Sequence, residues 1–147
     1  MGLDIVVYRT DASTEANSAL IRAKKDPHTG QYYYYFDSSN PKNQVPRNQV
    51  VATKLRIGNT WAMAELKEDL NQAAGSTGLP LLEWCTRDGS HSGDLIRYEL
   101  LGNLEHEIQY LFDTRRLHIS MNLRVFLAKI LEAIQIARQE KNPIVFV

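Results

Sequence analysis

The sequence has one cysteine, no net charge and no long apolar run, and each absence excludes a class of protein. Because Cys85 is the single thiol, the chain cannot form an internal disulfide or supply the several sulfur ligands of a structural zinc site. The N-terminal residues lack the basic start of a signal peptide, and no apolar stretch approaches the roughly 20 residues that span a bilayer. We therefore expect a cytoplasmic protein without a membrane partner.

The charges are evenly balanced, with seventeen basic and seventeen acidic residues. Proteins that bind nucleic acid draw much of their affinity from phosphates that Lys and Arg neutralise, so the balance disfavours a nucleic-acid partner. The same balance provides little electrostatic repulsion between copies of the chain. It therefore favours self-association near neutral pH.

The length and composition predict one globular domain. A chain of 147 residues suits a single domain, residues 1–147, that can bury a core without disulfides or metals. The hydrophobic fraction of 44% and the charged fraction of 23% are close to globular averages, which argues against disorder of the whole chain.

Four segments read as strands because they are short and rich in β-branched and aromatic residues: 3–9, 31–36, 49–57 and 144–147. The apolar residues of the first run without alternation, which suits a strand covered on both faces. We expect the last segment to lie beside the first, at an edge of one small, mostly antiparallel sheet that also holds the other two. Residues 79–86 read as a further strand or extended segment.

Residues 13–25 are ambiguous. A capping Ser13 or Thr14 and alanines at helical spacing favour a loop or short helix that feeds a hairpin. The alternative is a strand over 18–25, paired with the strand at 31–36 through the turn at 26–30, where Asp26-Pro27 and Gly30 are turn formers.

Three longer segments have helical periodicity. Thr60 or Asn59 caps the first, which ends at Gly75, and Ser120 caps the last, which runs to about Lys141. Between them, residues 95–115 carry an apolar stripe, and the short connector at 116–119 makes the last two helices an antiparallel hairpin. Because strands come first and helices later, we expect an α+β fold, with the C-terminal helical hairpin covering the sheet.

The aromatic run at 32–36 is the most distinctive stretch of the sequence. Alternation along a strand places Tyr32, Tyr34 and Phe36 on one face and Tyr33 and Tyr35 on the other, so the five rings cannot form one platform. The favoured interpretation is a strand between the core and a second contact surface. An exposed patch for a protein partner, or a stacking site for a ligand or single-stranded nucleic acid on Tyr32, Tyr34 and Phe36, are the alternatives.

The segment 85–94 gathers residue types that catalysis uses. Cys85 could act as a nucleophile, His91 as its base, and Asp94 or Asp88 as the group that orients the base. Ordinary turn and capping chemistry accounts for the same residues, and the segment matches no known catalytic signature. Asp88 and His91 could also bind a small molecule ahead of the following helix.

The tryptophans and histidines are further candidate site residues. Trp61 lies off the apolar stripe of its helix, so it packs across the helix start or is exposed at an interface, while Trp84 is expected to face the core. The four histidines are far apart in sequence, and neither a metal motif nor a cofactor fingerprint is present. We therefore expect no metal and no cofactor.

The sequence also carries a resemblance. The opening Met1-Gly-Leu-Asp-Ile5 before a β run, the turn at 90–94 before a helix, and the helix that ends in a β run at 137–147 resemble small uncharacterised bacterial and phage proteins that open in this way. The resemblance covers part of the chain. It implies no activity, cofactor or site residue.

These observations favour a non-catalytic interaction or accessory module whose partner is itself or another protein. A small-molecule-binding protein or enzyme that uses the segment from Cys85 to Asp94 is the alternative. Single-stranded nucleic-acid binding through Tyr32, Tyr34 and Phe36 is the second alternative.

Overall fold

A computed structural model describes residues 2–9, 21–25, 32–36, 51–87 and 94–146. Its centre is a four-stranded antiparallel sheet in the order β4-β1-β6-β5. The strands are β1 (Gly2–Tyr8), β4 (Val51–Asn59), β5 (Leu95–Ile96) and β6 (Ile144–Phe146). The α+β class and the antiparallel sheet predicted from the sequence are thereby confirmed.

The first strand owes its central place to its apolar run. β1 pairs with β4 on one side and with β6 on the other, and Ile5, Val6 and Val7 are all buried. Such a strand must be apolar toward both faces of the sheet. The expected pairing of the last segment with the first is confirmed, but its expected position at an edge is wrong. β6 lies between β1 and β5, and the short β5 forms the edge.

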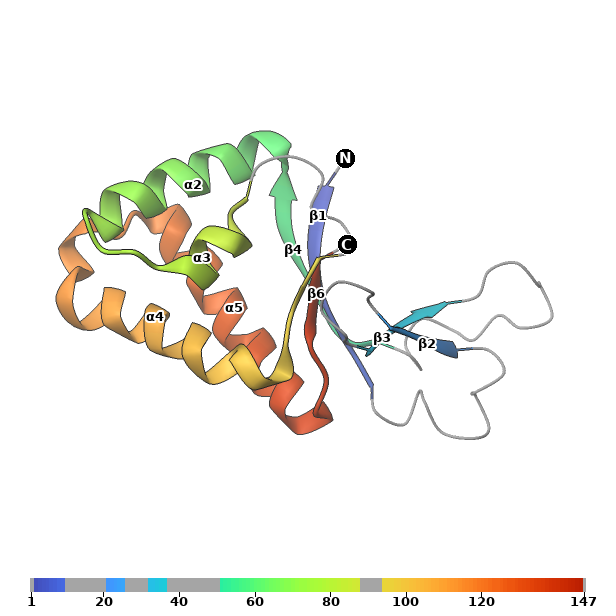
Figure 1. The fold of residues 1–147 in the computed structure, drawn as a ribbon. Helices are drawn as coiled ribbons and strands as arrows, with labels where there is room; N and C mark the ends of the chain where they lie inside the picture. Colours follow the sequence, from blue (N-terminus) through green and yellow to red (C-terminus); the bar gives the residue numbers. More distant parts are fainter. Residues whose placement is uncertain (1, 10–20, 26–31, 37–50, 88–93, 147) are drawn as a thin grey trace.

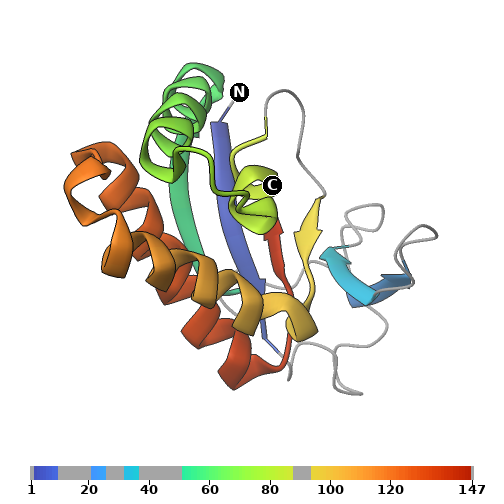
Figure 2. The ribbon, with the colours of Figure 1, turned by 60° about the vertical axis from the view of Figure 1, so that its left-hand side comes forward.

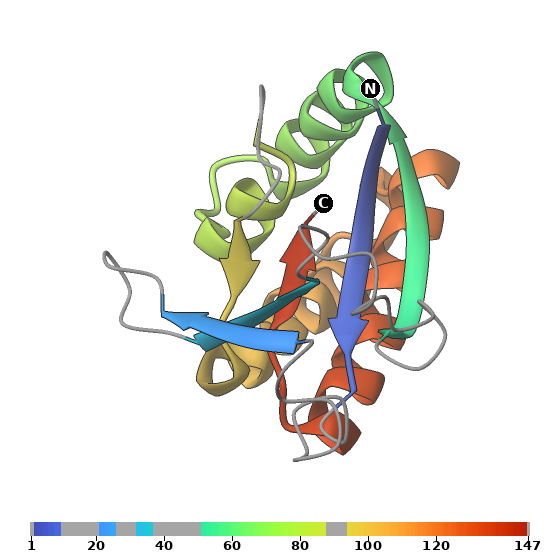
Figure 3. The ribbon, with the colours of Figure 1, turned by 90° about the vertical axis from the view of Figure 1, so that its right-hand side faces the viewer.

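The tyrosine segment does not belong to this sheet, which corrects the expectation. β3 (Tyr32–Phe36) pairs with β2 (Ile21–Lys25) in a separate two-stranded antiparallel sheet. β1 is paired on both sides, with β4 and β6, and the strands β2 and β3 pair with each other. The hairpin alternative for residues 18–25 is therefore the right one for 21–25, and residues 13–20 lie outside the described part. Figures 1 and 3 show this β2–β3 sheet on the side of the main sheet away from the helices.

The long helices lie on the other face of the main sheet, as Figures 1 and 2 show: α2 (Thr60–Ala74), α4 (Leu101–Thr114) and α5 (Met121–Glu140). The cover by the C-terminal hairpin, α4 and α5, is confirmed. The apolar stripes that the sequence predicts are the buried ones. The core combines apolar residues of the sheet and of the helices, and its largest fully buried members include Ile5, Phe146, Leu70, Leu104, Ile108, Leu127 and Ile130.

Capping side chains set the helix starts. Asn59 Oδ1 accepts a hydrogen bond from the Ala62 backbone N–H at 2.9 Å, so Asn59 rather than Thr60 caps α2. Ser120 Oγ accepts from the Leu123 N–H at 3.1 Å at the start of α5. The same hydroxyl donates to Asp69 Oδ2 of α2 at 2.7 Å, which ties the start of one helix to the other.

The segment expected to be extended at 79–86 is instead a short helix, α3 (Pro80–Cys85). Pro80 stands at its first turn, where the missing N–H costs nothing. Leu79, Leu82 and Cys85 recur every third residue and are buried, a helical spacing that the strand interpretation overlooked. Glu107 of α4 accepts from the Leu81 and Leu82 N–H groups at 3.1 and 2.8 Å and so satisfies the open end of α3.

The helix expected from residue 95 begins later, at Leu101. Leu95 and Ile96 form β5 because they pair with Val145 and Ile144 of β6. A single 3₁₀ turn, Tyr98–Leu100, then leads into α4. Another, Arg116–His118, forms the short connection to α5, as the hairpin prediction requires.

Candidate functional site

The segment 85–94 is described only at its two ends. Cys85 is fully buried, and burial, with a smaller effect of the Glu107 charge, raises the pKa of its thiol far above the usual value. A buried thiol held in its protonated form is not the thiolate that a nucleophile requires. Asp88 and His91 lie outside the described residues. Asp94 is described, and its carbonyl oxygen accepts from the Phe146 N–H at 2.9 Å.

Near Cys85, the carboxyl group of Glu107 is half-buried. Burial raises its pKa, as does the charge of Glu83, while the hydrogen bonds from the Leu82 and Leu81 N–H groups act in the opposite direction. Both oxygens of the carboxyl group are used in these bonds. Glu107 therefore holds α3 in place, which is a structural role.

The tyrosine strand, β3, has a defined antiparallel register with β2. Tyr32, Tyr34 and Phe36 stand opposite Lys25, Ala23 and Ile21. Tyr33 and Tyr35 stand opposite Lys24 and Arg22. The register therefore pairs every residue of β3 with a residue of β2.

The two tryptophans have different surroundings from each other. Trp61 is 75% exposed at the start of α2, and its indole Nε1 donates to Glu65 Oε1 at 2.9 Å. Trp84 is 37% exposed, with the Arg87 guanidinium 5.0 Å from its ring centre. The expectation that Trp84 faces the core is wrong. It assumed alternation with Leu82 along a strand, whereas residues two apart on a helix point in different directions.

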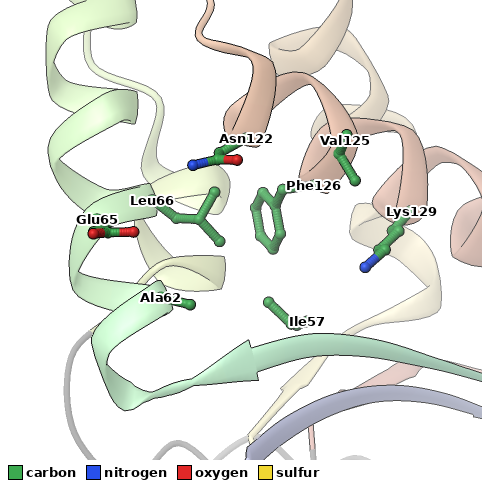
Figure 4. A pocket seen from close by; sticks show the side chains of 8 residues that line it. All are labelled: Ile57, Ala62, Glu65, Leu66, Asn122, Val125, Phe126 and Lys129. Carbon is green, nitrogen blue, oxygen red and sulfur yellow. The ribbon is translucent and has the colours of Figure 1, made fainter.

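A groove opens where β4, α2 and α5 meet (Figure 4). Its hollow measures about 220 Å³. Ile57 of β4, Leu66 of α2 and Phe126 of α5 point into it and make its surface largely apolar. The remaining lining residues are Ala62, Glu65, Asn122, Val125 and Lys129.

Exposed apolar side chains flank this groove. Val125 lines the α5 wall and is 49% exposed, and Met121, one turn earlier on the same helix, is 71% exposed. Trp61 stands on the α2 side, one turn before Glu65. We call these three side chains together with the groove the groove face. Apolar groups left in water around an apolar hollow are typical of a surface that binds another protein.

Two opposite charges stand on opposite walls of the groove. Glu65 belongs to α2 and Lys129 to α5, as Figure 4 shows. Lys129 Nζ donates to the carbonyl oxygen of Arg56, near the end of β4. The groove can therefore hold an apolar group and offer one charge of each sign beside it.

Sequence reasoning found Trp61 but missed the rest of the groove face. A signal was available for its exposed apolar members. Val125 and Met121 are apolar residues that lie outside the buried stripe of α5, as Trp61 lies outside that of α2. Ile57, Ala62 and Lys129 gave no such signal, because their meeting depends on how the three elements pack.

Among the described residues, no group of three or more His, Cys, Asp or Glu side chains could hold a metal ion. No helix in that same part of the chain is long and apolar enough to cross a membrane. No protein-family model, curated protein or solved structure matches the chain.

Proposed function

We propose that this protein is a non-catalytic interaction module that associates with itself through the groove face. The observation that carries the proposal is the 75% exposure of Trp61 beside an apolar groove. A large aromatic side chain gains free energy when it leaves water, and Trp is enriched among the residues that dominate binding energy at interfaces.

The charges of the chain support a second copy as the partner. A chain with seventeen basic and seventeen acidic residues has no net repulsion to overcome when it meets its own copy. The groove face is balanced in the same way, since Glu65 and Lys129 are its two charged lining residues within the described part of the chain. A surface that carries both signs can be complementary to itself.

The alternative site at residues 85–94 gains less support. Its nucleophile candidate, Cys85, is buried and protonated, so the chemistry proposed for it would first require α3 to open. The groove face needs no such opening. We therefore favour interaction over catalysis, in the cytoplasm that the single thiol suggests.

Size-exclusion chromatography with light scattering, run over a wide range of protein concentration, tests the proposal. We expect the mass to rise from monomer to dimer as the concentration increases. Trp61→Ala should move this transition to higher concentration, because the side chain that gains most from burial is removed.

The matched control is Leu117→Ala. Leu117 is 97% exposed but does not line the groove, so its loss should leave the transition unchanged. A chain that stays monomeric at every concentration would refute self-association.

A further inference from the structure

We infer that two copies join across a two-fold axis, each placing Trp61 in the groove of the other. This inference rests on the proposed function and specifies its geometry. It follows from the position of Trp61, an exposed side chain on the helix that forms one wall of the groove.

The projection and the hollow are neighbours in the chain. Trp61 directly precedes Ala62 and is one turn before Glu65, and both of these residues line the groove. When a projection and its hollow lie on one face, a two-fold axis satisfies both at once and closes the assembly at two copies. Trp61 is not in its own groove, since it is 75% exposed and bonded to Glu65.

The hollow is large enough for the side chain. An apolar cavity of about 150 Å³ accepts benzene in another protein, so about 220 Å³ has room for the larger indole. The surface it would meet is apolar, because Ile57, Leu66 and Phe126 point into the groove (Figure 4). The indole N–H can keep its bond to Glu65 at the rim.

The two charges fit the same arrangement. Glu65 is one turn after Trp61 on α2 and accepts its indole N–H, so it lies beside the indole that enters the other molecule. There the far wall of the groove carries the partner's Lys129. Each insertion thus brings a carboxylate toward an ammonium group, and the two-fold axis creates this contact twice.

The expected interface is small. Two indoles bury roughly 300–500 Å² together, less than half of the roughly 1,200 Å² typical of a stable complex. Met121 and Val125, exposed on the other side of the groove, supply further apolar area. The dimer should therefore form reversibly and depend on concentration.

A charge-exchange experiment tests the arrangement. Glu65→Lys and Lys129→Glu, each measured alone by sedimentation, should weaken the dimer by about tenfold or more, because each variant brings like charges together twice. An equimolar mixture of the two should dimerise as well as the unaltered chain, since both contacts then join unlike charges. The control is Glu83→Lys, which makes the same charge change on α3, outside the groove.

A spectroscopic test keeps both charged residues in place. In Trp84→Phe, Trp61 is the single tryptophan, so its emission should shift to shorter wavelength as the concentration rises and the indole leaves water. An emission that stays constant while a dimer forms overturns the inference.

The outcomes separate the two proposals. If the unaltered chain is monomeric throughout, self-association itself fails. If it dimerises but the single charge variants do so equally well, or if the mixture does not recover, the reciprocal insertion fails and self-association stands. Circular dichroism of each variant confirms that the comparison is between folded proteins.

Discussion

The carboxylate of Asp4 in β1 forms ion pairs that should make the stability of the protein depend on pH. Its carboxylate lies 2.9 Å from Lys54 Nζ and 3.3 Å from Arg56 Nη1, and its own side chain is largely buried. Burial alone would raise the pKa of Asp4. The hydrogen bond and charge of Lys54, followed by those of Arg56, outweigh burial and lower the pKa below its ordinary value of 3.8.

The lowered pKa of Asp4 predicts the sign of a pH effect. A carboxyl group with a depressed pKa in the folded state stabilises the protein above its unfolded value, and this contribution is lost as the pH falls through the folded pKa. We expect Asp4→Asn to lower the free energy of unfolding by about 1–2 kcal/mol at neutral pH, a moderate value because both cations are partly exposed. The loss should shrink below pH 3.8.

Urea titrations of both chains across this pH range would measure the difference. Asp113→Asn is the matched control, because Asp113 is an exposed aspartate on α4 that accepts from Gln109. A difference for Asp4→Asn that does not change with pH would contradict the role given to the ion pairs.

At the scale of whole elements, the junction between β4 and α2 is tightly packed. Gly58 has φ of +156°, and a Cβ atom placed there would lie 2.8 Å from the Ala62 Cβ. The pairing of β1 with β4 shifts register at this place, between Leu3 and Asp4. The close approach at Gly58 brings the end of β4 against the first turn of α2, which forms one side of the groove.

Gly58→Ala should therefore destabilise the protein. We expect a loss of about 1–3 kcal/mol, because the new methyl group strains the backbone and must displace Ala62. Gly78→Ala serves as the control, since a Cβ at Gly78 meets nothing within 4 Å and should change stability by less than about 0.5 kcal/mol. Chemical denaturation gives both values, and equal effects would show that the junction is not constrained.

At the scale of the whole molecule, the groove face belongs to no single element. β4, α2 and α5 each contribute lining residues, and contacts across the fold hold them together, including the bond between Ser120 and Asp69. A partner that binds there also bridges the sheet and two helices. Association should therefore stabilise the folded chain as a unit.

This linkage predicts that stability depends on protein concentration. Once the dimer is populated, each tenfold rise in concentration should add about 1.4 kcal/mol per mole of dimer to the free energy of unfolding. Denaturation midpoints measured at several concentrations should rise for the unaltered chain and much less for Trp61→Ala. Midpoints of the unaltered chain that coincide at all concentrations would contradict the linkage.

The sequence by itself determined the local features of this protein. The apolar run at Ile5–Val7, the helical stripes and the capping residues Asn59 and Ser120 act over a few residues. Each of these features depends only on the alternation of a strand, the period of a helix or a capping hydrogen bond between close neighbours in the chain. The corresponding strands and helices could therefore be predicted without knowledge of the fold. The α+β class followed from the order of these elements.

Only the tertiary structure decided which remote segments meet. The position of β6 inside the sheet, the separation of the β2–β3 sheet and the helical form of α3 depend on partners that are distant in sequence. The groove face arises in the same way, because Ile57, Leu66 and Phe126 come together only when three elements pack. Local sequence patterns indicate which side chains prefer burial. The packing of the elements determines which apolar side chains remain exposed next to one another.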